Sequence, residues 1–230
     1  MSTLSQLLRA EPAATEPRVA PLGAETTATV VVPHTNPIHN EQIHALVQQL
    51  FFGRESGLVR HVGFAPLEAS AQTTSLCLDV ASVLAEEGSY DVGLIDAGSG
   101  PILLQHELDI AAPENGEATC PVASRLWLAP RQSWWQQFGH KPMTDQDLSR
   151  LRDLMTAFDF SVLCCPPISW QTARIGLNCD GLVLILTANK TRRLVAAQIR
   201  DQLSKARIPL LGTVLAERRF PVPRGLYRSL

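Results

Sequence analysis

The chain has 230 residues, of which 45% are hydrophobic and 18% charged, and its formal net charge is −2. These values are typical of a folded globular protein with one sizeable core. They give no electrostatic case for nucleic-acid binding, and no apolar run approaches the roughly 20 residues of a membrane-spanning helix. The N-terminus has no apolar core of a secretory signal, so we expect a cytoplasmic protein.

The first 36 residues are rich in Ala, Pro, Thr and Glu and show little periodicity, which predicts a flexible leader. We expect a single domain over residues 37–230, with a basic and aromatic C-terminal arm from about residue 216. Apolar residues at helical spacing predict a first helix over residues 41–52. The five cysteines contain no C-x-x-C pair, so we expect reduced thiols with a packing role.

Strands and helices are then expected to alternate. A strand over 58–64 precedes a helix over 72–87, and Thr144 is a plausible N-cap for a later helix. The strand expected at 181–187 is almost wholly apolar, which favours a central position buried on both faces. The remaining elements are strands at 91–96, 125–129, 159–165 and 208–215 and a helix at 191–206. This order predicts an α/β fold with a mostly parallel β-sheet flanked by helices.

The segment 98–143 is the least regular part of the chain and contains the pair Trp134-Trp135. One interpretation makes the pair an exposed contact patch. The other, which we favour, makes it a cap on the sheet edge. Loops at the carboxyl ends of parallel strands are where ligands or partners usually meet this architecture.

The segment 69–74 joins a strand to a helix, where a phosphate-binding loop would read G-x-x-x-x-G-K-[ST]. Small alanines stand where the glycines would be, and Gln72 stands where the lysine would be. A register shifted by one residue would put Thr73 at the lysine position, and neither register supplies a cation. The hydroxyls of Thr73 and Thr74 remain. No lysine occurs before Lys141, so the loop has no neighbouring lysine as a substitute.

In chain order, several segments resemble bacterial tyrosine autokinases that control capsule and exopolysaccharide export, within the wider group of MinD/ParA-type P-loop ATPases. Residues 41–52 resemble the opening helix of the family, and residues 94–97 resemble its second acidic motif, L-I-D-A-D. Residues 158–167 resemble the Walker B strand, Y-D-Y-V-I-I-D-T-P-P, with Cys164 at the aspartate. Residues 180–185 and 208–223 resemble later motifs. The resemblance covers roughly residues 37–230 and implies a P-loop NTPase-like fold of the MinD/ParA type.

The same resemblance implies a degenerate nucleotide site. Active members need a lysine on the phosphates, a hydroxyl on Mg²⁺ and an aspartate for the metal. Here the residues at the corresponding positions are Ala69, Ser70, Ala71, Gln72, Thr73, Thr74 and Asp96, with Cys164 at the Walker B position. We therefore expect no catalytic residue, no resident metal and no resident cofactor. Weak binding of ATP and Mg²⁺ stays an open alternative.

Two further departures concern assembly and phosphorylation. The family's opening helix carries E-x-x-R-x-x-R, which resembles a subunit-ring contact, but His44 and Val47 stand at its two arginine positions. Active kinases of the family tend to end in a tyrosine cluster, whereas Tyr227 is alone near this C-terminus. The surrounding arm either binds a partner or an acidic surface, or packs its aromatic residues on the sheet.

Taken with the lost residues, the resemblance predicts a catalytically silent regulator or scaffold in exopolysaccharide biosynthesis and export. Its expected partner is a protein of that machinery or an active paralogue. Self-association and recruitment to the inner face of the membrane by a membrane partner stay open. The alternatives are a weakly active or partner-completed ATPase or tyrosine autokinase, and a binding module for an unrelated ligand.

Overall fold

A computed structural model describes residues 37–53, 58–68, 72–98, 104–110, 118–135, 142–188 and 190–216. The expected leader over residues 1–36, the C-terminal arm and the loop residues Ala69, Ser70 and Ala71 lie outside these ranges. None of the helices within them combines the length and the apolar character that crossing a bilayer would need.

A single sheet of seven strands, in the order β3-β4-β2-β5-β1-β6-β7, forms the centre of the described molecule. All neighbouring strands are parallel except β3 and β4, which are antiparallel. The strands are β1 (His61–Pro66), β2 (Val92–Asp96), β3 (Cys120–Ala123), β4 (Leu126–Ala129), β5 (Phe160–Cys164), β6 (Gly181–Thr187) and β7 (Leu210–Ala216). The predicted α/β fold with a mostly parallel sheet is confirmed.

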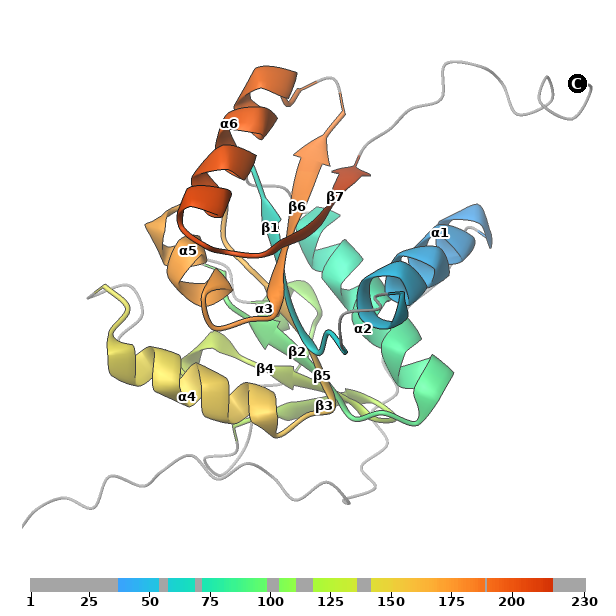
Figure 1. Ribbon diagram of the computed structural model, residues 1–230. Helices are drawn as coiled ribbons and strands as arrows, with labels where there is room; N and C mark the ends of the chain where they lie inside the picture. The colour runs from blue at the N-terminus through green and yellow to red at the C-terminus, as the bar shows by residue number, and fades with distance from the viewer. Residues whose placement is uncertain are drawn as a thin grey trace, which may run out of the picture.

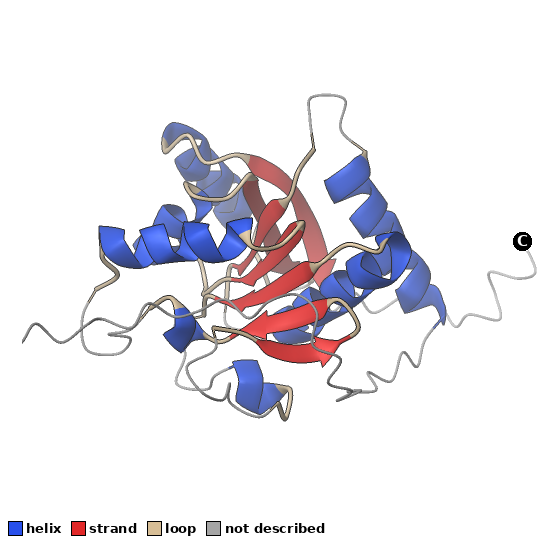
Figure 2. Cartoon of the chain, turned by 90° about the horizontal axis from the view of Figure 1, so that it is seen from below, coloured by secondary structure: helices blue, strands red, loops and turns tan. Residues whose placement is uncertain are grey.

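Helices cover both faces of this sheet (Figures 1 and 2). On one face, α1 and α2 pack on one apolar cluster, and on the other face α4, α5 and α6 pack on a second. The helices are α1 (Pro37–Val47), continued by a π-helix η1 (Gln48–Phe52), α2 (Gln72–Gly88), α3 (Leu104–Glu107), α4 (Asp145–Thr156), α5 (Trp170–Gly176) and α6 (Arg193–Lys205), with a 3₁₀ turn η2 (Arg131–Ser133). The chain therefore folds as three layers, with the sheet between two layers of helices.

Some elements differ from the sequence prediction. The strand β6 is buried on both faces as expected, but it is the next-to-last strand rather than the central one, because β7 alone lies beyond it. The antiparallel β3 and the short α3 and α5 were not predicted. Each has seven residues or fewer, which is too short for a clear periodic pattern.

Candidate functional site

Those residues of the expected phosphate site that the structure describes lie at the carboxyl edge of the sheet. The strands β2, β5 and β1 are consecutive neighbours and run parallel, so they end together. Asp96 at the end of β2 pairs in register with Cys164 at the end of β5, and Cys164 pairs in turn with Phe64 of β1. The predicted proximity of Asp96 and Cys164 thus follows from the topology.

The helix α2 begins at Gln72, where the family has its phosphate-binding lysine. Gln72 is exposed, whereas Thr73 is only 4% exposed. Within the described part of the chain, the Thr73 hydroxyl has no hydrogen-bond partner. The amino end of a long helix favours an anion through its free N–H groups and its dipole. At this point the start of α2 offers backbone N–H groups and a hydroxyl, without a side-chain cation at position 72.

The carboxylate of Asp96 is enclosed by donors from its own protein. Its Oδ1 and Oδ2 lie 3.0 and 3.2 Å from Nη2 of Arg131. Oδ1 also accepts the N–H of Gly98 at 2.9 Å, and Oδ2 accepts that of Leu104 at 3.0 Å. Asp96 and Arg131 are 2% and 1% exposed, so this is a buried ion pair. Both carboxylate oxygens therefore already bind a backbone donor and a guanidinium group.

Arg131 reaches Asp96 because β4 is the parallel neighbour of β2 and ends at the same edge. The turn η2 follows β4 and directs Arg131 onto the end of β2. Next in the chain, Trp134 donates from Nε1 to the backbone oxygen of Asp96 at 3.0 Å. A Cβ atom at Gly98 would lie 3.1 Å from Arg131 Nη2, so this position favours a residue without a side chain.

The tryptophan pair belongs to the same enclosure. Trp134 and Trp135 are 0% and 3% exposed, and their ring centroids lie 5.9 Å apart. The interpretation of the pair as an exposed contact patch is therefore wrong, and its interpretation as a cap on the sheet agrees with the burial of both rings.

The side chain at the Walker B position, Cys164, is also buried. Cys164 is 8% exposed, and its side chain lies beside the Cys77 thiol of α2. Burial, together with this contact, raises the pKa of the Cys77 thiol well above its usual value. Because Mg²⁺ takes oxygen ligands in octahedral geometry, a thiol at this position is a poor substitute for a carboxylate. The side chains at Gln72, Asp96 and Cys164 therefore do not fit a bound Mg–ATP.

The two residues at the positions of the family's ring arginines both contact other parts of this protein. Val47 is 0% exposed and belongs to the apolar cluster between α1 and α2. His44 contacts the carboxylate of Glu87 on α2 through Nδ1, and Gln48 donates to the same carboxylate at 2.9 Å. Both residues thus join α1 to α2 within one chain.

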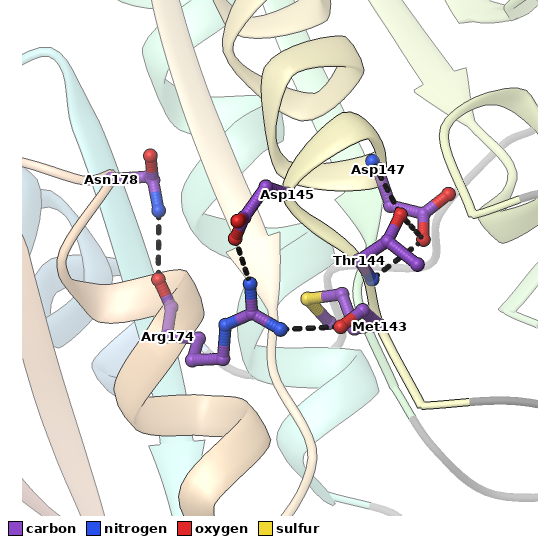
Figure 3. Close-up of polar contacts among 6 residues, drawn as sticks. All are labelled: Met143, Thr144, Asp145, Asp147, Arg174 and Asn178. Atoms are coloured by element: carbon purple, nitrogen blue, oxygen red, sulfur yellow. Dashed lines mark hydrogen bonds and ion pairs between the residues drawn. The ribbon is translucent and has the colours of Figure 1, made fainter.

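The start of α4 is held by polar contacts within the helix and with α5 (Figure 3). Arg174 of α5 donates to the backbone oxygen of Met143 and to the carboxylate of Asp145. The predicted N-cap Thr144 is confirmed: it forms a capping box with Asp147. The helix α5 therefore holds residues 143–145, where α4 begins.

Solved structures with a similar fold include kinase domains of tyrosine kinases. The kinase domain of the Escherichia coli tyrosine kinase ETK has a TM-score of 0.61 at 14% identity, over 81% of this chain and 80% of its own. The chimerical protein CapA2B2 has a TM-score of 0.61 at 14% identity, over 79% and 85% of the two chains. A ParA family ATPase from Chlorobium tepidum has a TM-score of 0.51 at 12% identity, over 68% and 73%.

The fold is that of the ParA/MinD-type P-loop NTPases. Neither protein-family models nor curated proteins give a match to the sequence. At these identities the similarity establishes the P-loop fold, and the chemistry of the site has to be argued from its own residues.

The sequence prediction missed Arg131, the cation of this site. A search limited to the phosphate loop finds no cation, because Arg131 lies about 60 positions further along the chain. The sequence position of Arg131 nevertheless indicated that it could reach the site, because Arg131 directly follows Pro130 at the end of a predicted strand. In a parallel sheet, residues that follow different strands meet at one edge.

Proposed function

We propose that this protein is a catalytically silent relative of the tyrosine autokinases that acts as a regulator or scaffold in exopolysaccharide biosynthesis and export. It acts through protein–protein contacts rather than by phosphoryl transfer. The observation that carries this proposal is the buried ion pair between Asp96 and Arg131. It supports the proposal because the one acidic residue retained from the phosphate motifs is already neutralised inside the protein.

Phosphoryl transfer depends almost entirely on positioning and on stabilising negative charge with cations and metal. Gln72 offers no charge to a phosphate, and Cys164 offers no carboxylate to Mg²⁺. The loss of a single electrostatic group at an active site typically lowers the rate by about 10²–10³-fold. These losses together favour a protein that uses the surface of this fold to contact other proteins and does not catalyse phosphoryl transfer.

The pathway rests on the resemblance of the sequence to the capsule and exopolysaccharide autokinases, and the folds of ETK and CapA2B2 are consistent with it. The proposed partner is a protein of the polysaccharide export machinery or an active paralogue. In this proposal the protein is cytoplasmic and reaches the membrane through such a partner.

A second candidate is a weakly active or partner-completed ATPase or autokinase. It is favoured by the buried Thr73 hydroxyl at the amino end of α2, which has no hydrogen-bond partner among the described residues. A partner would then have to supply the phosphate-binding cation and a metal-binding carboxylate.

Calorimetric titration of the full chain with ATP and Mg²⁺ separates the two candidates. The silent scaffold predicts no binding stronger than about 1 mM and no turnover. Micromolar binding that requires Mg²⁺, or turnover that Asp96→Ala abolishes, would contradict it.

The variants Thr73→Val and Thr74→Val are a matched pair for this titration. Binding that is lost in Thr73→Val and kept in Thr74→Val would support the second candidate, since the buried Thr73 hydroxyl has no hydrogen-bond partner among the described residues.

A further inference from the structure

The small net charge of the chain conceals a strong separation of charge along it. Residues 188–230 contain ten Lys and Arg and two Asp and Glu, a net charge of +8. Residues 1–187 contain ten Lys and Arg and twenty Asp and Glu, a net charge of −10. The C-terminal fifth of the protein is therefore cationic, and the remainder is acidic.

In the described structure, this positive charge lies on α6 and on the two connections that flank it. All six cations of residues 190–216 are exposed, and Asp201 is the one acidic residue among them. These cations are Lys190, Arg192, Arg193, Arg200, Lys205 and Arg207. Since exposed cations on one element sum to a field that attracts anions, α6 presents a surface for an acidic partner.

A groove of about 540 Å³ lies between the end of α6 and the start of β7. Arg200, Asp201, Ser204 and Arg207 line it with polar groups, and residues 208–210 line it with apolar ones. Arg200 pairs with its neighbour Asp201 at 2.8 Å. The groove therefore offers a second guanidinium and a hydroxyl to an acidic side chain, above an apolar wall.

The backbone of Arg207 adopts a conformation that is unfavourable for a residue with a side chain. Its φ of 57° is in the left-handed region, directly after the C-cap of α6. Glycine is the usual residue in this conformation after a helix, because a side chain there costs about 1 kcal/mol. Replacing Arg207 by glycine would thus remove the charge and relieve the backbone.

The strand β7 beside this groove is an open sheet edge. The backbone oxygen of Ala216 accepts from Ala188 at the end of β6, so alternate residues of β7 turn their main-chain groups toward β6. Thr213 and Leu215 alternate with the residues that face β6, so their main-chain N–H and C=O groups point away from β6. No other described strand lies on that side. Leu215 is also 52% exposed.

The two edges of the sheet differ in their protection. At the opposite edge, β3 has four residues, a bulge and a proline, Pro121. These features prevent strand addition. In contrast, β7 has seven residues without charge or proline, and its irregular pairing is confined to the start. A long uncharged edge is a template on which an extended polypeptide can add a strand.

We propose that the α6–β7 face binds an extended acidic segment of a partner protein. The segment adds as a further strand along β7 and places an acidic side chain in the groove at Arg200 and Arg207. This interaction gives the proposed scaffold a contact surface, and it rests on the proposed function only for the expectation of a protein partner.

The chemistry of the face favours a peptide over other polyanions. Asp201 stands in the wall of the groove, where it repels a doubly charged phosphate group more strongly than a single carboxylate. The outward main-chain groups of Thr213 and Leu215 match those of another extended chain. Exposed apolar side chains such as Leu194, at 71% exposure, do not help to bind a nucleic-acid backbone.

Fluorescence anisotropy tests the charge requirement on the full chain. The probes are two labelled peptides of about ten residues, one alternating Glu with Val and one alternating Lys with Val. We expect the acidic peptide alone to bind, with an affinity that falls roughly tenfold between low and moderate salt.

The variant with both Arg200→Gln and Arg207→Gly should weaken binding at least about tenfold without lowering the melting temperature. The matched control is Arg152→Gln, because Arg152 is an exposed arginine on α4. Equal binding of the Lys peptide, or unchanged binding by the double variant, would overturn the proposal.

A second pair of measurements tests strand addition. A peptide with the same glutamates but with proline in place of valine should not bind, because proline cannot donate to a strand. Hydrogen exchange at the amides of Thr213 and Leu215 should slow when the acidic peptide binds, while that of Val214, which faces β6, stays unchanged. Binding of the proline peptide would overturn strand addition, as would tighter binding of anionic vesicles or duplex DNA through the same arginines.

These results are independent of the nucleotide titration. Peptide binding together with micromolar Mg–ATP binding would contradict the proposal that the protein is catalytically silent and would leave the proposed docking face supported. If neither the peptide nor Mg–ATP bound, only the proposed docking face would be contradicted.

Discussion

At the scale of single residues, the decisive feature is the pairing of Asp96 with Arg131. A buried ion pair is not in itself a strong source of stability, because desolvation of both charges offsets their attraction. Removal of one partner is costly, since it leaves the other charge buried. The pair therefore fixes Asp96 in a structural role and joins β4 to β2.

Arg131→Met should destabilise the protein by about 3 kcal/mol, because it leaves the Asp96 carboxylate with backbone donors alone. Urea unfolding followed by tryptophan fluorescence measures this loss. Arg152→Met is the control, since Arg152 is exposed and should cost less than about 0.5 kcal/mol. Equal effects of the two substitutions would show that Arg131 does not act through the buried pair.

Cys179, which is partly buried, illustrates how its surroundings change the chemistry of a residue. Burial, with a smaller contribution from Asp180, raises the pKa of its thiol from 9.0 to about 12. The thiol donates to the backbone oxygen of Ile175 at 3.3 Å. Because the thiolate is the reactive form, Cys179 should be unreactive in the folded protein.

This shift has a consequence for stability at high pH. The folded state holds the proton above pH 9, where the unfolded chain releases it, so stability is complete below pH 9 and falls as pH rises toward 12. From Cys179 the loss should reach about 1 kcal/mol by pH 10. Unfolding curves between pH 8 and 10 measure it. In Cys179→Ala this part of the pH dependence should disappear, and an unchanged slope would contradict the assignment.

At the scale of elements, the start of α4 depends on side chains from two helices. The capping box satisfies backbone donors within α4, while Arg174 ties the same turn to α5 (Figure 3). Asn178 Nδ2 donates to the backbone oxygen of Arg174 at 2.8 Å, which holds the following turn of α5. Residues 143–145 are thus fixed by contacts within α4 and with α5.

Thr144→Ala should lower the free energy of unfolding by about 1 kcal/mol, because it removes the side-chain acceptor for the N–H of Asp147. Thr144→Ser keeps the hydroxyl and should cost a small fraction of that. Chemical denaturation of both variants gives the comparison. If serine cost as much as alanine, packing of the threonine methyl rather than capping would be responsible.

At the scale of the whole molecule, the sheet has two unlike ends. The end at β3 is short and interrupted by proline, and the end at β7 is long, uncharged and next to a cationic helix. Because the body of the chain is acidic and its C-terminal fifth is basic, an acidic partner would be repelled by most of the molecule and attracted to this end. The peptide experiments above belong to this scale.

By itself, the sequence determined the α/β class and most of the elements. Long apolar strands alternate with amphipathic helices, and local signals such as Thr144 at a helix start act over a few residues. It also predicted that Asp96 and Cys164 would lie together, because both follow from motif order in a parallel sheet.

Only the tertiary structure decided what these residues do. In the sequence Asp96 is a candidate residue of a degenerate nucleotide site and Trp134 a candidate for an exposed contact, whereas the structure pairs Asp96 with the distant Arg131 and buries Trp134. The open edge of β7 was equally invisible, because which strand lies last in a sheet depends on strand order. The physical reason is common to all three: long-range contacts depend on how strands pair, and local sequence patterns do not encode that pairing.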